Sequence, residues 1–427
     1  MTQSFDPAAG SLGADSAAES FTPRASILEA LRYRDFRLLW LGLLISNLGT
    51  WMQFTAMGFF VARMAGSQHQ AALDLGILGA ARAIPVLVLS PLAGVVADRL
   101  PRRRVLFVTN TTMAFAALLL ASLATVHRLN MPALVLISAL NSAANGFDSP
   151  VRQSWVPLLV DREYVGNAVG LNSVAFNAPA VIGPAFAGLL IVWIGVAGAF
   201  YFNAAATLAV VVAVILMRPS PPSVTYREPT LRAMQQGIVF IARHPALRWI
   251  VLAQLVTSLL TRPYSQLIPA LTVNVLHAGA GGLGWAVSAI GVGGFGGALI
   301  TAYFAQRERR SRLWMLSSLL MSFGVCALGF VPTLGVAVPL LFVIGVGTLA
   351  SMGATNTLIQ VLSPDDVRGR TLSIYTMIAI GVVPLGALVN GAIASSLGLR
   401  PTFAIAGAIC TLLFLAIWFL RPIVRTL

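Results

Sequence analysis

The stretch Gly94-Val-Val-Ala-Asp98-Arg99-Leu-Pro101-Arg102-Arg103-Arg104 closes one long apolar run, residues 75–97, and leads into the next, 105–126. Both runs reach the ~20 residues that a helix needs to cross the hydrocarbon of a bilayer. A basic loop alone would explain the arginines but not a glycine four residues before an aspartate. The stretch therefore predicts a specific tight turn between two membrane helices, on the side of the membrane where basic loops gather.

The chain from residue 38 to residue 420 repeats this pattern of apolar runs and short gaps. Hydrophobic residues make up 57% of the sequence and charged residues only 10%. Uninterrupted runs disfavour a β-barrel, whose strands alternate apolar and polar residues. We predict an all-α membrane protein with twelve transmembrane helices, at 38–62, 75–97, 105–126, 131–147, 164–193, 196–217, 249–276, 283–306, 313–331, 334–361, 371–397 and 401–420.

The 28 basic residues are all arginine, and 23 of them fall in the leader, the tail and every second gap. By the positive-inside bias both termini are cytoplasmic, in a bacterial-type plasma membrane. The formal net charge is +14. Such a charge in a soluble protein would suggest nucleic acid, but in short loops beside the membrane it indicates topology and attraction to anionic lipids.

The longest internal gap, 218–248, divides the runs six and six. It contains a stretch, Thr230 to Arg243, that predicts a short helix on the membrane surface. A weak repeat at an offset of about 202 residues relates the halves, as expected for a transporter with a central site. We therefore expect a leader over 1–37, two pseudo-symmetric six-helix bundles over 38–217 and 249–420, the linker 218–248 between them, and a tail over 421–427.

The turn after residue 94 resembles the signature loop of the major facilitator superfamily, Gly-x-x-x-Asp-Arg-x-Gly-Arg-Arg, with Pro101 in place of the second glycine. Asp148-Ser-Pro150-Val-Arg152-Gln153 and Asp366-Val-Arg368-Gly-Arg370 are similar to the branch that contains the enterobactin exporter and macrolide efflux pumps, the drug:proton antiporter-3 type. The resemblance implies a cytoplasmic latch in which Asp98 engages Arg99 or Arg102 and the start of helix eleven near Thr371. Its gating residues would be Gly94, Asp98, Arg99, Arg102 and Arg103.

The fifth run resembles the antiporter motif of exporters. It matches at Gly170, Gly183, Pro184 and Gly188, and departs from the motif at Pro179 and Ala187. Glycine permits close helix contact and proline removes a backbone donor, so the segment is suited to a place where the halves rock. The alternative is an ordinary packed and kinked helix. The resemblance favours export.

The resemblance also implies that helices one, four, seven and ten wall the substrate cavity, and each carries polar groups. Pairs four residues apart share a helical face, although polar residues also bind membrane helices to one another. Gln53 is expected to point away from the face of Asn47 and Trp51. The substrate-binding candidates are Asn47, Trp51, Arg82, Asn141, Asn145, Gln254, Ser258, Arg262, Asn356 and Gln360.

Arg262 and Arg82 lie inside apolar runs, where a charge is costly and calls for a cavity or a partner. Their alternative role is a structural bond to backbone carbonyls. No acidic residue is central in a run, so the pattern favours an anionic or neutral substrate over a lipophilic cation. The candidates for proton coupling lie at helix ends or in the turn, each with an alternative as a cap or a solvated residue: Asp98, Asp74, Asp148 and His277.

These observations predict a secondary transporter, a proton-driven exporter of a siderophore-like molecule, organic anion or drug that works by alternating access as a monomer. An importer or a lysolipid flippase is the alternative on this fold, and a non-transporting receptor the alternative of another class. No Gly-Lys-Ser/Thr nucleotide loop is present. The four histidines are scattered singly, and Cys326 and Cys410 lie inside runs. We therefore expect no enzyme, no cofactor and no metal site.

Overall fold

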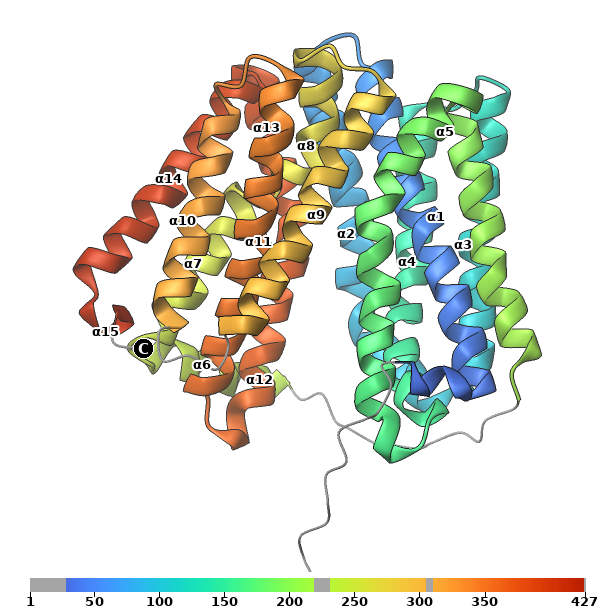
Figure 1. Cartoon of the computed structure of the whole chain (residues 1–427), viewed down its shortest axis with the longest axis horizontal. Coiled ribbons are helices and arrows are strands. Elements are labelled where there is room, and N and C mark those ends of the chain that lie inside the picture. Colours follow the sequence, from blue (N-terminus) through green and yellow to red (C-terminus); the bar gives the residue numbers. More distant parts are fainter. Residues whose placement is uncertain (1–27, 219–230, 305–309, 426–427) are drawn as a thin grey trace, which may run out of the picture.

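The structure, a computed structural model, describes residues 28–218, 231–304 and 310–425. Helices account for nearly all of this described part, and no strand occurs within it. Figure 1 shows the helices as two upright groups side by side, one blue to green and the other yellow to red. The chain therefore folds as two helical bundles, with the N-terminal half in one and the C-terminal half in the other.

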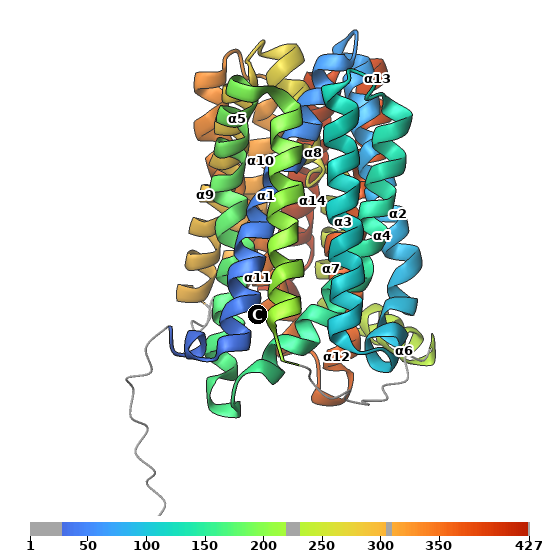
Figure 2. The same ribbon diagram turned by 90° about the vertical axis from the view of Figure 1, so that its right-hand side faces the viewer.

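The N-terminal bundle follows the predicted runs closely. Its long helices are α1 (Arg34–Met64), α2 (Gln68–Arg99), α3 (Arg102–Thr125), α4 (Met131–Trp155) and α5 (Val165–Leu216), with short turns η1 (Glu29–Arg32), η2 (Val156–Leu159) and η3 (Arg162–Tyr164) at their ends. Figure 2 views this bundle from its own side, where α1 packs along α5.

One glycine divides α5 into two membrane segments. Gly195 has φ 77° and ψ −179°, a conformation that residues with a Cβ rarely adopt. The chain reverses direction there, between the predicted runs 164–193 and 196–217 (Figure 1). The reversal brings both halves of α5 alongside other helices of the same bundle.

The C-terminal bundle contains broken helices that the sequence pattern treated as single runs. It begins with α6 (Leu231–Arg243), the short helix expected in the linker. The first broken segment consists of α7 (Leu247–Leu260), α8 (Tyr264–Ala270) and the π-helical turn η4 (Leu271–Val275), and it is followed by α9 (Ala280–Phe304), α10 (Arg310–Leu328) and α11 (Leu334–Leu362). The second consists of α12 (Asp365–Thr376), the π-helical turn η5 (Met377–Gly381) and α13 (Val383–Leu397), and it is followed by α14 (Leu399–Leu420) and α15 (Pro422–Arg425). The breaks lie beside Pro263 and Pro384, where the ring removes a helical hydrogen bond.

Length and hydropathy identify eight helices of the described residues that could cross a membrane, or nine if the bent pair Gln235–Arg243 and Leu247–Val275 is one span. The segment Arg162–Leu216 is among them and contains the reversal at Gly195. Within the described residues every predicted run falls mostly on helix, and the number twelve stays a prediction. Large apolar side chains such as Leu136, Trp193 and Phe330 are exposed on the bundle surface, as expected where lipid is the solvent.

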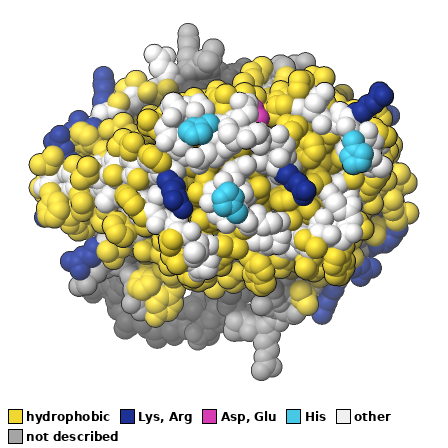
Figure 3. Space-filling model, turned by 90° about the horizontal axis from the view of Figure 1, so that it is seen from above, with side chains coloured by type: hydrophobic (Ala, Val, Ile, Leu, Met, Phe, Trp, Pro, Cys, Tyr) yellow, Lys and Arg dark blue, Asp and Glu magenta, His cyan; other side chains and the backbone are white. Residues whose placement is uncertain are grey.

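We call the end of the molecule that carries α6, α12 and α15 the basic end, and the other the opposite end (Figure 1). Figure 3 looks down on the opposite end, where hydrophobic side chains prevail and basic ones are scattered. The two bundles meet near this end. Gly188 of α5 lies so close to α9 that a Cβ atom there would be 2.9 Å from the Ala280 carbonyl oxygen and 3.3 Å from the Gly284 Cα.

A second contact between the bundles joins α2 to α13 at the same end. A Cβ atom at Gly391 would lie 2.5 Å from the Ala72 carbonyl oxygen. Nearby, the Asn274 side-chain amide donates to the Ala62 carbonyl at 2.9 Å. Glycine lets the helix backbones touch directly, so this end is closed by backbone packing between the bundles.

Candidate functional site

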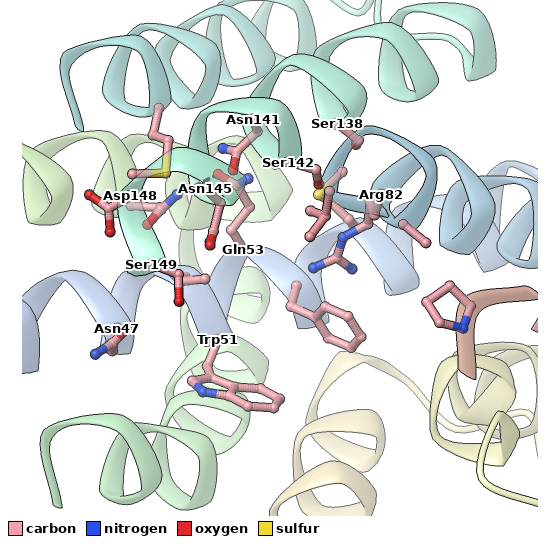
Figure 4. A pocket seen from close by; sticks show the side chains of 18 of the residues that line it. Asn47, Trp51, Gln53, Arg82, Ser138, Asn141, Ser142, Asn145, Asp148 and Ser149 are labelled. Carbon is pink, nitrogen blue, oxygen red and sulfur yellow. Dashed lines mark hydrogen bonds between the residues drawn. The ribbon is translucent and has the colours of Figure 1, made fainter. Parts of the chain in front are cut away.

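A cavity of about 460 Å³ lies between the bundles and belongs mostly to the N-terminal one. Helices α1, α2 and α4 supply most of its wall, and the C-terminal bundle adds Gln266, Ile380, Gly381 and Pro384. Figure 4 shows polar side chains of α1 and α4 and the guanidinium of Arg82 turned toward the same space. Volumes of this order suit small organic ligands.

Helix α1 lines the cavity with residues spaced by helical turns. Asn47 and Trp51 are both in the wall, and the Asn47 amide also donates to the Ala175 carbonyl of α5 at 2.9 Å. Gln53, expected to point elsewhere, is in the wall as well, and its oxygen accepts a 2.6 Å hydrogen bond from Asn203. That expectation was wrong because the wall extends around α1 to the second half of α5.

Helix α4 presents one polar face to the cavity, formed by Asn141, Asn145, Asp148 and Arg152. The helix continues to Trp155, beyond the predicted end at residue 147. Asp148 therefore lies two turns inside the helix, with only 3% of its surface exposed. The prediction that Asp148 lies at a helix end was wrong, because the length of the run was judged by apolar residues alone.

Asp148 is held by three neighbours. Its Oδ1 accepts hydrogen bonds from the Asn110 amide at 2.7 Å and from the Thr109 hydroxyl at 3.1 Å, both on α3. Its Oδ2 is 3.6 Å from Nη1 of Arg152, one turn along α4. Buried charges persist when they are paired and hydrogen-bonded, so this network stabilises a carboxylate at the cavity wall.

Arg82 of α2 also lines the cavity. Its Cζ atom lies 4.3 Å from the centre of the Phe54 ring, within the range of a cation–π contact. Phe54 in turn meets Trp51 edge-on, with ring centres 5.8 Å apart. The Arg82 side chain thus packs on Phe54 of α1 while its nitrogens face the cavity (Figure 4).

The candidates of the C-terminal bundle lie outside this cavity wall. Nη1 of Arg262 donates to the Ala379 carbonyl at 2.7 Å, and Nη2 lies 2.8 Å from the Met352 sulfur. The bond to Ala379 corresponds to the alternative role given for Arg262 from the sequence, a structural hydrogen bond to a backbone carbonyl. Gln254 donates to Ser258 at 3.1 Å, and Gln360 donates to Asn356 at 2.6 Å.

Two further candidates for proton coupling lie toward the opposite end. Asp74 is 7% exposed and accepts a 2.8 Å hydrogen bond from Gln70, one turn earlier in α2. His277 follows η4 with φ 51°. Neither residue is in the cavity wall, so among the candidates with described side chains only Asp148 combines a titratable group with that wall.

The predicted latch is placed only in part. The side chains of Gly94, Asp98 and Arg99 lie outside the described residues. Arg103 donates to the carbonyls of Val214 at 2.9 Å and Ile215 at 2.6 Å, at the C-terminal end of α5, where unpaired carbonyls favour a cation. Thr371 bonds Ser363 at 2.9 Å. Arg102 begins α3.

The antiporter-like residues of α5 differ in their surroundings. A Cβ atom at Gly170 would meet nothing within 4 Å, whereas one at Gly183 would lie 2.8 Å from the Trp51 Cβ. Pro184 is buried in α5, and its carbonyl oxygen is 2.8 Å from where a Cβ at Gly284 would stand. Together with Gly188, three of the four residues lie at close helix contacts.

Several residues of the wall and of the network around Asp148 were not singled out from the sequence. Thr109 and Asn110 lie inside the run 105–126, and Asn203 inside the run 196–217. A buried polar group within a membrane span is a signal of function or of helix association, so these three could have been found. Gln266 could not, because its position depends on the turn between α7 and α8. Among the described residues, no three His, Cys, Asp or Glu side chains cluster as metal ligands.

The chain is similar in sequence to a known protein family and to several characterised transporters. The family model described as transmembrane secretion effector matches residues 25–426. The multidrug efflux pump Tap of Mycolicibacterium fortuitum is 26% identical over 84% of this chain and 89% of its own. The staphyloferrin A transporter of Staphylococcus aureus is 26% identical over the same shares, and enterobactin exporter EntS of Shigella boydii is 26% identical over 83% of this chain and 85% of its own.

Solved structures agree on the fold. The crystal structure of a bacterial homologue of the human lysosomal transporter Spinster, in an inward-facing and unoccupied conformation, superposes with a TM-score of 0.72 at 14% identity, covering 92% of this chain and 98% of that one. The family and the similar curated proteins are transporters rather than enzymes. The chain belongs to the transmembrane secretion effector family of the major facilitator superfamily.

Proposed function

We propose that the protein is a proton-coupled exporter of a small organic molecule, working by alternating access in a bacterial plasma membrane with its basic end in the cytoplasm. The description of the family and the names of the relatives, an efflux pump and a siderophore exporter, support export. The arginines of the leader, the tail and alternate loops support the orientation.

The observation that carries proton coupling is the buried carboxylate of Asp148 in the cavity wall. An ionisable residue inside a membrane bundle marks an ion or substrate pathway by default. When charged, Asp148 holds Arg152 across 3.6 Å. When a proton binds to its carboxylate, that attraction is lost and Arg152 becomes available to substrate. Proton binding and substrate binding therefore act on one network.

Alternating access is supported by where the bundles touch. The close contacts of α5 with α9 and of α2 with α13 lie near the opposite end. A state closed there offers its cavity to the basic end, from which an exporter collects its substrate. Rocking of one bundle against the other would then expose the same cavity to the other side.

Everted vesicles with an imposed pH gradient provide the test. Addition of substrate to vesicles that contain the protein should collapse the gradient, and protein-free vesicles should not respond. Asp148→Asn should abolish the proton movement while leaving the protein folded, because an amide fills the same volume without titrating. Asp365→Asn is the matched control, since that side chain is 88% exposed on α12. Proton movement that survives in Asp148→Asn would refute the assigned coupling residue.

The panel of compounds contains organic anions and lipophilic cations. Collapse with either class supports proton-coupled export. Movement of the substrate across the vesicle membrane in the same direction as the protons, rather than in the opposite direction, would indicate an importer instead. If neither class of compound changes the pH gradient, although the purified protein binds one of the compounds, proton coupling is refuted.

A further inference from the structure

Among the described residues that line the cavity, one cation has no counter-charge from another described residue. Its charged wall residues are Arg82, Asp148 and Arg152. Asp148 and Arg152 form an ion pair. Arg82 has no hydrogen-bond or ion-pair partner among the described residues, and its Cζ lies 4.3 Å from the centre of the Phe54 ring. The charges of the described wall residues therefore sum to one net positive charge, located at Arg82.

The orientation of Arg82 leaves its donors available. A guanidinium is planar, and its N–H groups all point outward in that plane. The contact with Phe54, in which Cζ lies 4.3 Å from the ring centre, supplies no hydrogen-bond acceptor of the carbonyl or carboxylate kind. A carboxylate that approaches along the edge can accept two parallel hydrogen bonds, which is the geometry that arginine provides and lysine does not.

The wall beside Arg82 is aromatic. Trp51 and Phe54 lie one turn apart along α1, with their rings in edge contact, and Phe176 of α5 adds a third ring to the cavity, with half of its surface exposed. Aromatic rings pack favourably against other rings in offset or edge arrangements. The surroundings of the uncompensated charge thus suit a ring more than a hydrated ion.

We infer that this part of the cavity is a binding site for aromatic organic anions, with a planar carboxylate on Arg82 and the ring against Trp51 and Phe54. The identification of this ligand as the transported substrate rests on the proposed function. A lipophilic cation is disfavoured in the same place, because it would meet the like charge of Arg82 in a medium of low dielectric constant.

Binding to the purified full-length protein in lipid nanodiscs, without any pH gradient, tests the site. The probes are three compounds with one ring system and different charge: naphthoate, naphthamide and naphthylmethylamine. At neutral pH they are an anion, a neutral molecule and a cation. The wild-type protein should bind naphthoate most tightly and the amine most weakly, as measured by calorimetric titration.

Arg82→Gln should reduce the affinity for naphthoate by about ten- to a hundred-fold, the value of a charge-assisted pair of hydrogen bonds. Its affinity for naphthamide should stay unchanged, which also verifies that the cavity is intact. Arg82→Lys should restore part of the loss, since it keeps the charge but not the planar donors. Arg63→Gln, the same change at an exposed position outside the cavity wall, should bind as the wild type does.

Equal binding of naphthoate and naphthamide by the wild type would overturn the inference. So would an equal loss of both in Arg82→Gln, tightest binding of the amine, or no binding of any of the three. The outcome is independent of the vesicle assay. Charge-selective binding without gradient-driven transport would refute the proposed function alone, and proton-coupled transport without charge selectivity would refute the site alone.

Discussion

Each of the two bundles contains a half-buried arginine inside a predicted apolar run, Arg82 or Arg262, and uses it differently. Arg262, in the C-terminal bundle, donates to the backbone carbonyl of Ala379 beside the π-helical turn η5. Arg82, in the N-terminal bundle, rests on a phenylalanine ring and faces the cavity without a polar partner among the described residues. Both interrupt an apolar run, so their sequence signals are alike. What separates a structural arginine from one that can bind a ligand is whether its guanidinium already has a hydrogen-bond partner in the protein. The residue type and its position within the membrane span do not separate them.

The asparagine and glutamine side chains of the two bundles differ in the same way as the two arginines. Asn141 and Asn145 of α4 face the cavity, whereas Asn356 and Gln360 of α11 bond each other outside its wall. The resemblance implied a cavity walled by helices one, four, seven and ten, whereas this cavity takes most of its wall from the N-terminal bundle. The N-terminal bundle supplies the polar wall, and the C-terminal bundle closes it with Gln266 and the residues around η5.

The largest expected effect concerns Arg262. Arg262→Gln should lower the free energy of unfolding by about 1.5–3 kcal/mol, because it removes a charge-assisted hydrogen bond and leaves the Ala379 carbonyl without it. Arg82→Gln should cause no comparable loss, since it breaks no hydrogen bond within the described residues. Denaturation of both variants in detergent measures the difference. Equal destabilisation would break the contrast between the two arginines.

A second prediction addresses the contact between the bundles. Gly188→Ala places a methyl group 2.9 Å from the Ala280 carbonyl oxygen, and such overpacking costs about 1–3 kcal/mol. The bundles should separate near the opposite end, which shifts the protein toward the alternate state. Spin labels at positions 193 and 285, in a background with Cys326 and Cys410 replaced by serine, should report a longer distance.

Gly170→Ala is the matched control, because nothing lies within 4 Å of the added methyl group. It should leave the distance between the labels unchanged. An unchanged distance in Gly188→Ala as well would mean that the contact between α5 and α9 does not set the state of the transporter.

A smaller effect is expected from the amides. Asn145→Ala should weaken the binding of a cavity ligand by about two- to ten-fold, the value of one neutral hydrogen bond. Asn356→Ala should change it little, because Asn356 bonds Gln360 outside the wall. Titration of naphthoate into both variants compares them. A greater loss in Asn356→Ala would place the ligand in the C-terminal bundle and reverse the assignment.

The smallest effect concerns pH at the entrance to the C-terminal bundle. Nδ1 of His244 accepts hydrogen bonds from the backbone N–H groups of Ala246 and Leu247 at 3.3 and 3.2 Å, just before α7. Partial burial lowers the pKa of His244 below its ordinary value. The folded state thus binds the proton less readily than the unfolded chain does, and stability is lost as the pH falls below about 6.5.

Thermal unfolding between neutral and mildly acidic pH should show this as a shallow decline that is absent in His244→Gln. The corresponding entrance of the N-terminal bundle relies on a bond from the Tyr33 hydroxyl to Asp161 at 2.6 Å, and it contains no histidine that would titrate in this range. An identical decline in wild type and variant would assign the pH dependence to other groups.

Most of the helices could be predicted because the signals are local. Twenty or so apolar residues in sequence require a helix in lipid wherever the rest of the chain lies. The reversal at Gly195 fell between two predicted runs for the same reason. The breaks at Pro263 and near Pro384 were less visible, since proline in a membrane helix either kinks it or ends it according to what its neighbours can bond.

The candidate site could be predicted only in part. Asn47, Trp51, Arg82, Asn141 and Asn145 were selected as polar or amphipathic groups inside runs, and all five are in the wall. The same criterion selected Gln254, Ser258 and Arg262, which the C-terminal bundle uses for internal bonds. It overlooked the burial of Asp148, because the residues that hold it, Thr109 and Asn110, come from another helix.

The sequence by itself determined that this chain is a helical membrane protein of a recognisable superfamily, since hydrophobic length, arginine placement and the motif at residues 94–104 are properties of short segments. Only the tertiary structure decided which polar residues face the cavity and which form hydrogen bonds inside a bundle. Those choices depend on contacts between residues far apart in the chain, such as Gln53 with Asn203 and Arg262 with Ala379. A helical period fixes a side chain's face, but not what lies opposite it.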